Sequence, residues 1–246
     1  MKVVILCGGK GSRLASPTEH KPKPLAMVNG KPIIWHIMKI YMKYGFNDFI
    51  LPLGFGGEKI KEYFWNYEWK NKNFIKDYSN NTIKFLDKPE NWKITFVDTG
   101  VDTMTGGRVK KVQKYIDGDA FMMTYGDGLS DINIKNLIDY HYHKGKIATV
   151  TGVERKSQYG ILTVENGIAK SFDEKSKLDG IINGGFFVLS TKVFDYIEDD
   201  AGCIFEQKPL KALAKQGELS VYLHRGYWAS IDTYKDLISA NKTWKI

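Results

Sequence analysis

Apolar runs of strand length alternate with helix-length amphipathic segments through the first half of the chain. Residues 3–7 form a continuous apolar run that ends at two glycines, which is typical of a buried strand in a parallel sheet. Apolar residues then recur at helical spacing between Pro32 and Gly45, two residues that favour the start and the end of a helix. A second apolar run at 49–53 and a helical pattern at 58–67 follow. This order predicts a parallel sheet with right-handed crossovers.

The alternation continues to about residue 153 and then becomes mixed. The further predicted strands lie at 92–97, 120–125, 148–153, 160–164, 168–173, 185–189 and 220–224, and the predicted helices at 106–115, 134–144, 191–196, 210–216 and 234–240. The polar segment 70–91 has no regular period, so no element is predicted there. No Pro/Ser-rich linker or internal repeat divides the chain. The sequence therefore predicts one α/β domain over 1–246, with a Rossmann-like, mixed but mainly parallel sheet flanked by helices.

Composition favours a protein that binds anionic ligands. The 36 Lys and Arg residues exceed the 28 Asp and Glu residues, which gives a formal net charge of +8. We expect no nucleic-acid partner, because no basic stripe is interleaved with aromatic residues, and no membrane partner, because no apolar run is long enough to span a bilayer. Cys7 and Cys203 lack the spacing of a metal cluster or a disulfide framework, so a cytoplasmic location is the default expectation.

A glycine-rich segment, Gly8-Gly9-Lys10-Gly11-Ser12-Arg13-Leu14, follows the first predicted strand, where open parallel sheets usually bind phosphates. It matches neither the Walker A nor the GxGxxG pattern, which argues against a kinase and a dehydrogenase. Its glycines allow backbone N–H groups to approach phosphate oxygens, and Arg13 adds a forked cationic donor. On the glycines alone, an ordinary strand-to-helix turn is an equal alternative. Lys21 and Lys23, on a proline-stiffened segment, favour polyphosphate binding.

Several motifs together resemble the sugar nucleotidyltransferase superfamily. They are GGxGSRL at 8–14, KPKPL at 21–25, GKPIIWHIMK at 30–39, VDTG at 97–100, MTGGR at 104–108, YGDG at 125–128, NGGFFV at 183–188, GYW at 226–228 and DT at 232–233. The MTGGR and NGGFFV segments are similar to the family that transfers a cytidylyl group to glucose 1-phosphate. The resemblance implies the nucleotide-diphospho-sugar transferase fold, CTP and a sugar 1-phosphate as substrates, Mg²⁺ as cofactor and a homo-oligomer. It also implies a nucleotide-binding portion at 1–153 and a sugar-binding and C-terminal portion at 154–246.

The resemblance further implies a cationic clamp and a metal at the nucleotide. Arg13 and Lys23 are expected to neutralise the β- and γ-phosphates and the departing pyrophosphate, and with Asp127 they form the expected catalytic set. Asp127 and Asp232 are expected to bind Mg²⁺, a hard cation that prefers carboxylate and phosphate oxygens. The full set of expected nucleotide contacts is Leu6, Gly8, Gly9, Gly11, Ser12, Arg13, Lys23, Thr105, Gly106, Arg108 and Gly126.

Some of these residues have purely structural alternatives. Asp127, between two glycines, also fits an ordinary turn, and Asp232 also fits the N-cap of the helix predicted at 234–240. Gly106 and Arg108 also fit a plain helix start. We favour their contact with the cytosine and the triphosphate, because glycine is a poor cap choice unless something must come close to the backbone.

The expected sugar-phosphate contacts are Tyr125, Tyr159, Gly160, Lys175, Asn183 and Gly184, with Lys175 binding the phosphate. Ser176 stands where the family has a proline, which leaves the placement of Lys175 open. The acceptor also stays open, because a few side chains can retune a pocket for hydroxylated ligands. Glucose 1-phosphate is favoured over another phosphorylated acceptor. The intact catalytic set argues against a third alternative, a nucleotide-sensing homologue without turnover.

Overall fold

The computed structural model describes residues 1–10, 21–156, 161–165, 168–173 and 178–245. Its central sheet has seven strands in the order β14-β10-β13-β8-β1-β4-β7. Their bounds are β1 Val3–Leu6, β4 Asp48–Leu53, β7 Lys93–Asp98, β8 Ala120–Tyr125, β10 Ala148–Lys156, β13 Leu178–Ser190 and β14 Leu219–His224. β1 pairs in parallel with β4 and β8, β4 with β7, and β10 with β14, whereas β13 is antiparallel to both β8 and β10. The predicted mixed, mainly parallel sheet is confirmed.

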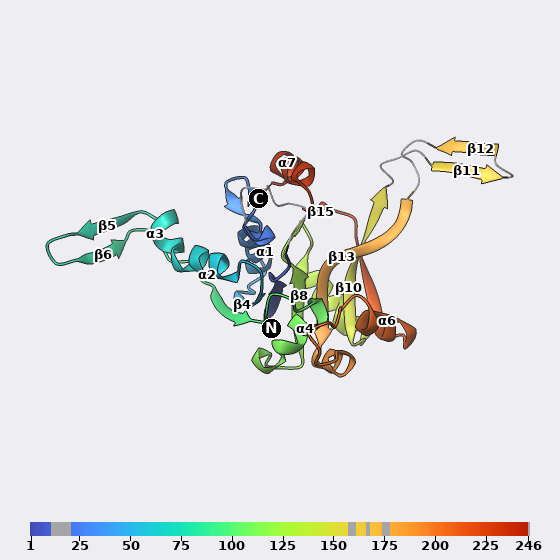
Figure 1. Cartoon of the computed structure of the whole chain (residues 1–246), viewed down its shortest axis with the longest axis horizontal. Coiled ribbons are helices and arrows are strands. Elements are labelled where there is room, and N and C mark those ends of the chain that lie inside the picture. Colours follow the sequence, from blue (N-terminus) through green and yellow to red (C-terminus); the bar gives the residue numbers. More distant parts are fainter. Residues whose placement is uncertain (11–20, 157–160, 166–167, 174–177, 246) are drawn as a thin grey trace.

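Helices cover both faces of this sheet (Figure 1). Alternate residues of β1 enter different cores: Val3 and Ile5 belong to one, and Val4 and Leu6 to the other. The first core is completed by α1 (Ile33–Met42), α2 (Gly57–Trp65), α5 (Ile134–Lys144) and α7 (Tyr234–Thr243), and the second by α4 (Thr105–Lys111), the 3-10 helix η3 (Thr191–Tyr196) and α6 (Lys208–Lys215). Burial on both faces explains why the strands are continuous apolar runs instead of alternating ones.

The observed elements follow the predicted order with local differences. The strands at 120–125 and 168–173 and the helix at 134–144 have the predicted bounds. The helix predicted at 58–67 is divided into α2 and α3 (Tyr67–Asn71), and the one predicted at 106–115 into α4 and the 3-10 helix η2 (Gln113–Tyr115). The segment predicted as a helix at 191–196 is the 3-10 helix η3. β13 starts seven residues before the predicted 185, because its first part pairs with β10.

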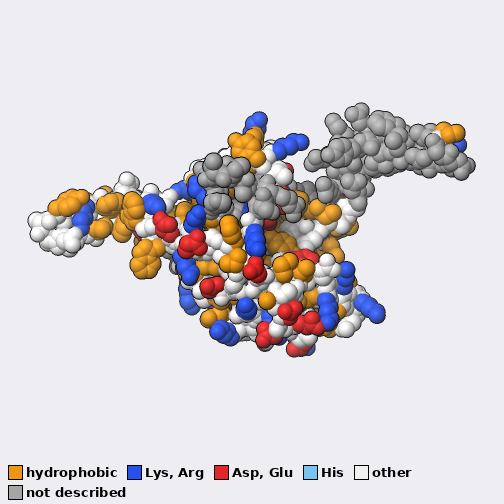
Figure 2. Space-filling model, in the orientation of Figure 1, with side chains coloured by type: hydrophobic (Ala, Val, Ile, Leu, Met, Phe, Trp, Pro, Cys, Tyr) orange, Lys and Arg blue, Asp and Glu red, His pale blue; other side chains and the backbone are white. Residues whose placement is uncertain are grey.

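Two hairpins extend away from the sheet in opposite directions (Figure 1). β5 (Phe74–Asp77) and β6 (Thr82–Phe85) form one within the segment left unassigned by its sequence, and β11 (Ile161–Glu165) and β12 (Ile168–Asp173) form the other. Hydrophobic side chains are exposed on the β5–β6 hairpin (Figure 2), among them Ile75 and Ile83. A hairpin with solvent on both faces needs no apolar alternation, which explains the missing signal.

Short elements complete the fold around the carboxyl ends of β1 and β8. They are the 3-10 helix η1 (Lys23–Leu25), β2 (Met27–Val28), β3 (Lys31–Pro32), β9 (Gly128–Ser130) and β15 (Trp228–Ser230). β2 pairs with β3, and β9 pairs with β15. Among the described helices, none has the length and apolar character needed to cross a membrane.

Candidate active site

A cavity of about 520 Å³ lies at the carboxyl ends of β1 and β8. It is lined by Leu6, Cys7, Gly8, Gly9, Lys10, Lys23, Pro24, Val101, Asp102, Thr103, Met104, Thr105, Arg108, Tyr125, Gly126, Asp127 and Asp232. Open α/β sheets bind ligands at this edge, and the volume is usual for a small-molecule site. Gly126 joins the two strand ends, because its N–H donates to the carbonyl of Leu6 at 3.1 Å. A Cβ at Gly126 would lie 2.7 Å from that oxygen, so this position requires glycine.

The pairing of β9 with β15 brings together two aspartates that are distant in the chain. Asp127 immediately precedes β9, and Asp232 follows the end of β15. Gly128 pairs with Ser230 across the two strands, and the N–H of Ile231 donates to the backbone carbonyl of Asp127 at 2.9 Å. The antiparallel register therefore places both carboxyl groups at one end of the cavity.

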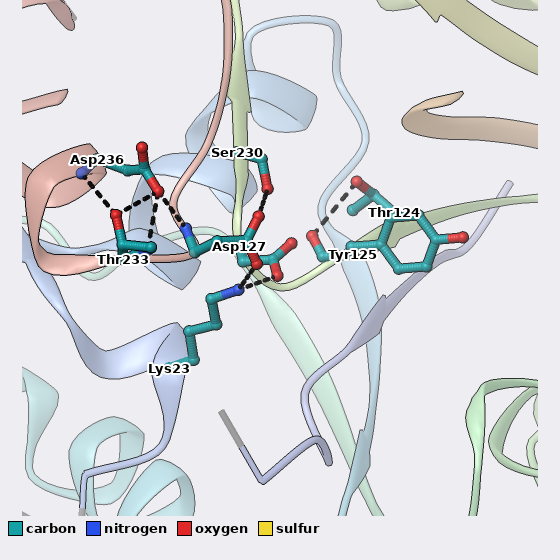
Figure 3. Close-up of polar contacts among 8 residues, drawn as sticks. Lys23, Thr124, Tyr125, Asp127, Ser230, Thr233 and Asp236 are labelled. Carbon is teal, nitrogen blue, oxygen red and sulfur yellow. Dashed lines mark hydrogen bonds and ion pairs between the residues drawn. The ribbon is translucent and has the colours of Figure 1, made fainter. Parts of the chain in front are cut away.

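Lys23 lies between these two carboxyl groups (Figure 3). Its Nζ atom is 2.6 Å from Asp127 Oδ2 and 2.7 Å from Asp232 Oδ1. Ser230 Oγ donates to the other oxygen of Asp232 at 2.7 Å. Burial acts to lower the pKa of Lys23, but the charges and hydrogen bonds of Asp127 and Asp232 outweigh burial and raise that pKa above its ordinary value. Lys23 is therefore held as an ammonium ion.

The alternative that Asp232 caps the final helix is wrong. Thr233 is the N-cap of α7: its hydroxyl oxygen accepts from the N–H of Asp236, and the Asp236 carboxylate accepts from the N–H of Thr233 (Figure 3). This reciprocal pair is a capping box. Asp127 does lie in the turn between β8 and β9, and its side chain contacts Lys23 from there, so both interpretations of Asp127 hold at once.

The two carboxylates suit a divalent metal ion. Within the described part of the chain, no three or more His, Cys, Asp or Glu side chains are grouped to hold a metal. Asp127 and Asp232 nevertheless share one cationic group at hydrogen-bond distance. Mg²⁺ is commonly held by one or two carboxylates and completes its coordination with water and substrate phosphates. The donor set therefore fits a metal ion bound together with a phosphate ligand.

Arg108 connects the two walls of the cavity. Its guanidinium donates to the carbonyls of Gly8, Leu53 and Gly100, each at 2.9 Å. It also donates to Thr99 Oγ1 at 2.6 Å. The side chain is only 3% exposed, and a Cβ at Gly8 would collide with it at 2.1 Å. Arg108 thus joins Gly8 to the loop after β7, while its direct contact with a base stays a prediction.

Glycine at 106 and 107 admits a neighbouring loop of the protein, whereas we expected it to admit a ligand. A Cβ at Gly106 would lie 2.6 Å from Cys203 Sγ and 2.9 Å from the Cys203 carbonyl oxygen, and one at Gly107 would lie 2.7 Å from the Asp200 carbonyl oxygen. The close neighbour that these glycines admit is the protein's own 200–203 loop. Thr105, one residue earlier, does line the cavity, whereas Gly106 is buried behind it.

Three of the predicted sugar contacts lie together beside the cavity. Asn183 Nδ2 donates to the Tyr125 hydroxyl at 3.3 Å, and Asn183 Oδ1 accepts from the N–H of Gly185 at 2.8 Å. The indole N–H of Trp228 donates to the carbonyl of Gly184 at 2.7 Å. β13 and β15 therefore fix Asn183 and Gly184 next to Tyr125. The predictions for Gly11, Ser12, Arg13, Tyr159, Gly160 and Lys175 lie outside the described residues.

Two features of the site were not predicted. Lys10 and Asp102, both lining the cavity, form an exposed ion pair at 2.7 Å. Glu206, in the turn before α6, accepts hydrogen bonds from the hydroxyls of Thr105 and Tyr125. No local pattern marks Glu206, because its partners are 101 and 81 residues away in the chain.

Comparisons with known proteins cover the whole chain. Residues 2–245 match the model of the family described as Nucleotidyl transferase. The chain is 59% identical to a Bacillus subtilis protein named probable glucose-1-phosphate cytidylyltransferase, over 99% of this chain and 96% of that protein. It is 46% identical to the glucose-1-phosphate cytidylyltransferase of Salmonella typhi, over 100% and 96%. Its structure is similar to that of HddC from Yersinia pseudotuberculosis complexed with GMP-PN, with a TM-score of 0.72, 26% identity and 99% of both chains covered.

Proposed function

The chain belongs to the nucleotidyl transferase family, and on that premise we propose that it forms CDP-glucose and pyrophosphate from CTP and glucose 1-phosphate. The observation that carries the proposal is the ammonium of Lys23, held by Asp127 and Asp232 at the end of a cavity that Gly8 and Gly9 also line. Such a site offers backbone N–H groups, a fixed cation and metal-binding carboxylates to one polyphosphate. The names of the relatives specify cytosine and glucose.

The reaction needs positioning and charge neutralisation more than proton transfer. An oxygen of the sugar phosphate attacks the α-phosphorus of CTP. The new P–O bond forms as the bond from the α-phosphorus to the bridging oxygen breaks, and pyrophosphate leaves with that electron pair. Negative charge spreads over the nonbridging oxygens and the leaving group. The ammonium of Lys23 lies at the end of the cavity and is the cation that we expect to neutralise this charge.

We assign the metal role to Mg²⁺, with Asp127 and Asp232 as the residues that would hold it. When bound, the ion would neutralise phosphate charge and orient the phosphate oxygens. Lys23 has a contact with each carboxylate. A metal would therefore share these oxygens with the lysine or displace it towards the phosphates.

Both portions of the chain contribute residues to the site in this proposal. Residues 1–153 supply Gly8, Gly9, Lys23, Tyr125 and Asp127, while residues 154–246 supply Asn183 and Asp232. The central sheet continues across residue 153, because β10 spans it and pairs with β13 and β14. This continuity supports a single domain over 1–246.

A panel of substrates tests the proposal. Pyrophosphate release is measured with CTP, UTP, dTTP, ATP and GTP, each against a set of sugar 1-phosphates, at saturating Mg²⁺. CTP with glucose 1-phosphate should be the fastest pair. A faster rate with another nucleotide would overturn the base assignment, and a faster rate with another acceptor would overturn the sugar assignment. No release from any pair by the folded protein would contradict an enzymatic role.

Self-association, which the family resemblance implies, stays a prediction. The exposed apolar side chains of the β5–β6 hairpin are where we expect the contact, because an isolated two-stranded hairpin is only marginally stable in water. Light scattering coupled to size exclusion measures the mass in solution, and the double variant Ile75→Lys, Ile83→Lys should reduce it.

A further inference from the structure

Glu206 joins two hydroxyl groups that both belong to the cavity. Glu206 Oε2 accepts from Thr105 Oγ1 at 2.6 Å, and Oε1 accepts from the hydroxyl of Tyr125. Thr105 and Tyr125 line the cavity, one at the N-terminus of α4 and the other at the end of β8. Glu206 itself is half-buried in the turn before α6. One carboxylate therefore ties the expected nucleotide side of the site to the expected sugar side.

The carboxylate also determines where both hydroxyl protons point. An ionised carboxylate only accepts hydrogen bonds, so Thr105 and Tyr125 must both direct their protons at Glu206. The Thr105 oxygen further accepts from the N–H of Phe205 at 2.9 Å, and the Tyr125 oxygen is approached by Asn183 Nδ2 at 3.3 Å. Because both protons are donated to Glu206, each hydroxyl can act towards a ligand only as a hydrogen-bond acceptor.

The ring of Tyr125 has little freedom to rearrange. A Cβ at Gly185, which has φ of +80°, would lie 2.7 Å from Tyr125 Cδ2, and Phe187 packs edge-on at a centroid distance of 5.9 Å. A tyrosine with a fixed ring and a committed proton is a defined acceptor for a ligand's hydroxyl group.

We infer that Glu206 is a positioning residue that holds the Tyr125 hydroxyl as a hydrogen-bond acceptor for a hydroxyl of the sugar phosphate, with Thr105 as the second anchor of the carboxylate. The inference rests on the proposed function, because it places the sugar beside Tyr125 and Asn183. It adds a residue that does not itself line the cavity and acts through two side chains that do.

The Glu206→Gln variant tests this role. An amide of the same shape offers one acceptor oxygen, so one of the two hydroxyls loses its partner and is free to turn its proton elsewhere. We expect KM for glucose 1-phosphate to rise about tenfold or more, in the range for a lost hydrogen bond to a charged group, while kcat changes less than about threefold. Glu198→Gln is the matched control, because Glu198 is exposed on the same stretch and pairs with Lys208. It should leave both constants unchanged.

A double-mutant cycle separates positioning from general loosening of the fold. In a Tyr125→Phe background, Glu206→Gln should raise KM by less than about threefold, because the hydroxyl that it orients is gone. An undiminished effect in that background, or a KM equal to that of Glu198→Gln, would overturn the inference. Should Glu206→Gln fail to fold, Thr105→Val removes the second anchor without altering Tyr125 or the carboxylate. It must then raise KM for glucose 1-phosphate, and an unchanged KM refutes the role.

Failure of the inference is distinguishable from failure of the proposed function. Wild-type protein that releases no pyrophosphate from any substrate pair contradicts the function. Titration calorimetry of glucose 1-phosphate into wild type and Glu206→Gln needs no turnover. Weaker binding by the variant supports the positioning role, and equal binding by the two proteins contradicts it.

Discussion

Replacing Lys23 by methionine removes the cation shared by Asp127 and Asp232 while keeping a side chain of similar length. Two opposite effects follow. Turnover should fall, because a fixed positive charge at the phosphates is lost. Removing one such preorganised electrostatic contact typically costs about 2.7–4 kcal/mol, or about 10²–10³ in kcat. Binding of a metal ion in the absence of nucleotide should become tighter, because no ammonium competes for the two carboxylates.

The size of the second effect follows from the geometry. One oxygen of each aspartate lies within 2.7 Å of Lys23 Nζ, so these two oxygens are at most about 5 Å apart. At that separation, and without the lysine, the two carboxylate charges repel each other by roughly 3 kcal/mol at an effective dielectric of about 20. The side chains of Asp127 and Asp232 are 28% and 39% exposed, so solvent screens part of this repulsion. We expect Mg²⁺ to bind the variant about 10- to 100-fold more tightly than wild type without CTP, which corresponds to about 1.4–2.8 kcal/mol.

Titration calorimetry of Mg²⁺, with and without CTP, measures this effect next to steady-state kinetics. Lys39→Met is the matched control, because Lys39 Nζ lies 2.6 Å from Glu90 Oε2 in an ion pair that does not line the cavity. The control should change neither turnover nor metal affinity. The reasoning is refuted if Lys23→Met keeps wild-type turnover, or if its affinity for Mg²⁺ without CTP equals that of wild type.

Three further predictions concern the site and the core. Asp127→Asn should lower turnover at least about 100-fold with an unchanged circular dichroism spectrum, and near-normal activity would rule out its metal role. Gly106→Val should lower the free energy of unfolding by about 1–3 kcal/mol in urea, because its Cβ would lie 2.6 Å from Cys203 Sγ; a stability equal to wild type would contradict that packing. Burial lowers the pKa of His36 and of His141 in the folded state. On acidification these histidines are therefore protonated in the unfolded chain first. Their contribution to the free energy of unfolding is complete above about pH 6.5 and is lost as the pH falls through their folded-state pKa values. The midpoints of urea unfolding between pH 7.5 and 5 measure this loss of stability, which should be smaller in His36→Gln than in wild type. An equal pH dependence in the two proteins would exclude His36 as a source of the loss.

The sequence was most informative where burial dictates the residues. The strand at 120–125 was predicted with its observed bounds, because both faces of a central strand are covered and its residues are continuously apolar. The first part of β13 was missed, since Gly180, Asn183 and Gly184 resemble turn residues. Antiparallel pairing of Leu178, Ile181, Ile182 and Asn183 with β10 stabilises this part as a strand, with Gly180 and Gly184 at shifts of the register. A local pattern contains no information about that partner.

The sequence predicted those parts of the candidate site that follow from short motifs and their order along the chain. The glycine-rich segment at 8–14 follows the first strand in the sequence, and the motifs around Lys23 and Asp127 indicated the family. The reason for glycine at 106 was misjudged. A glycine indicates that another group lies close to the backbone, but the sequence does not show whether that group is a ligand or another part of the protein. The structure shows that the neighbour is the loop around Cys203.

By itself, the sequence determined the alternation of strands and helices, the place of the glycine-rich segment after the first strand, and the family. These features depend on periodicity and on short motifs, which neighbouring residues encode. Only the tertiary structure decided that Asp232 contacts Lys23 instead of capping α7, and that Glu206 unites Thr105 with Tyr125. Those contacts depend on the register of β9 with β15 and on the packing of the 200–207 turn against α4, and such relations arise only when distant segments fold onto one sheet edge.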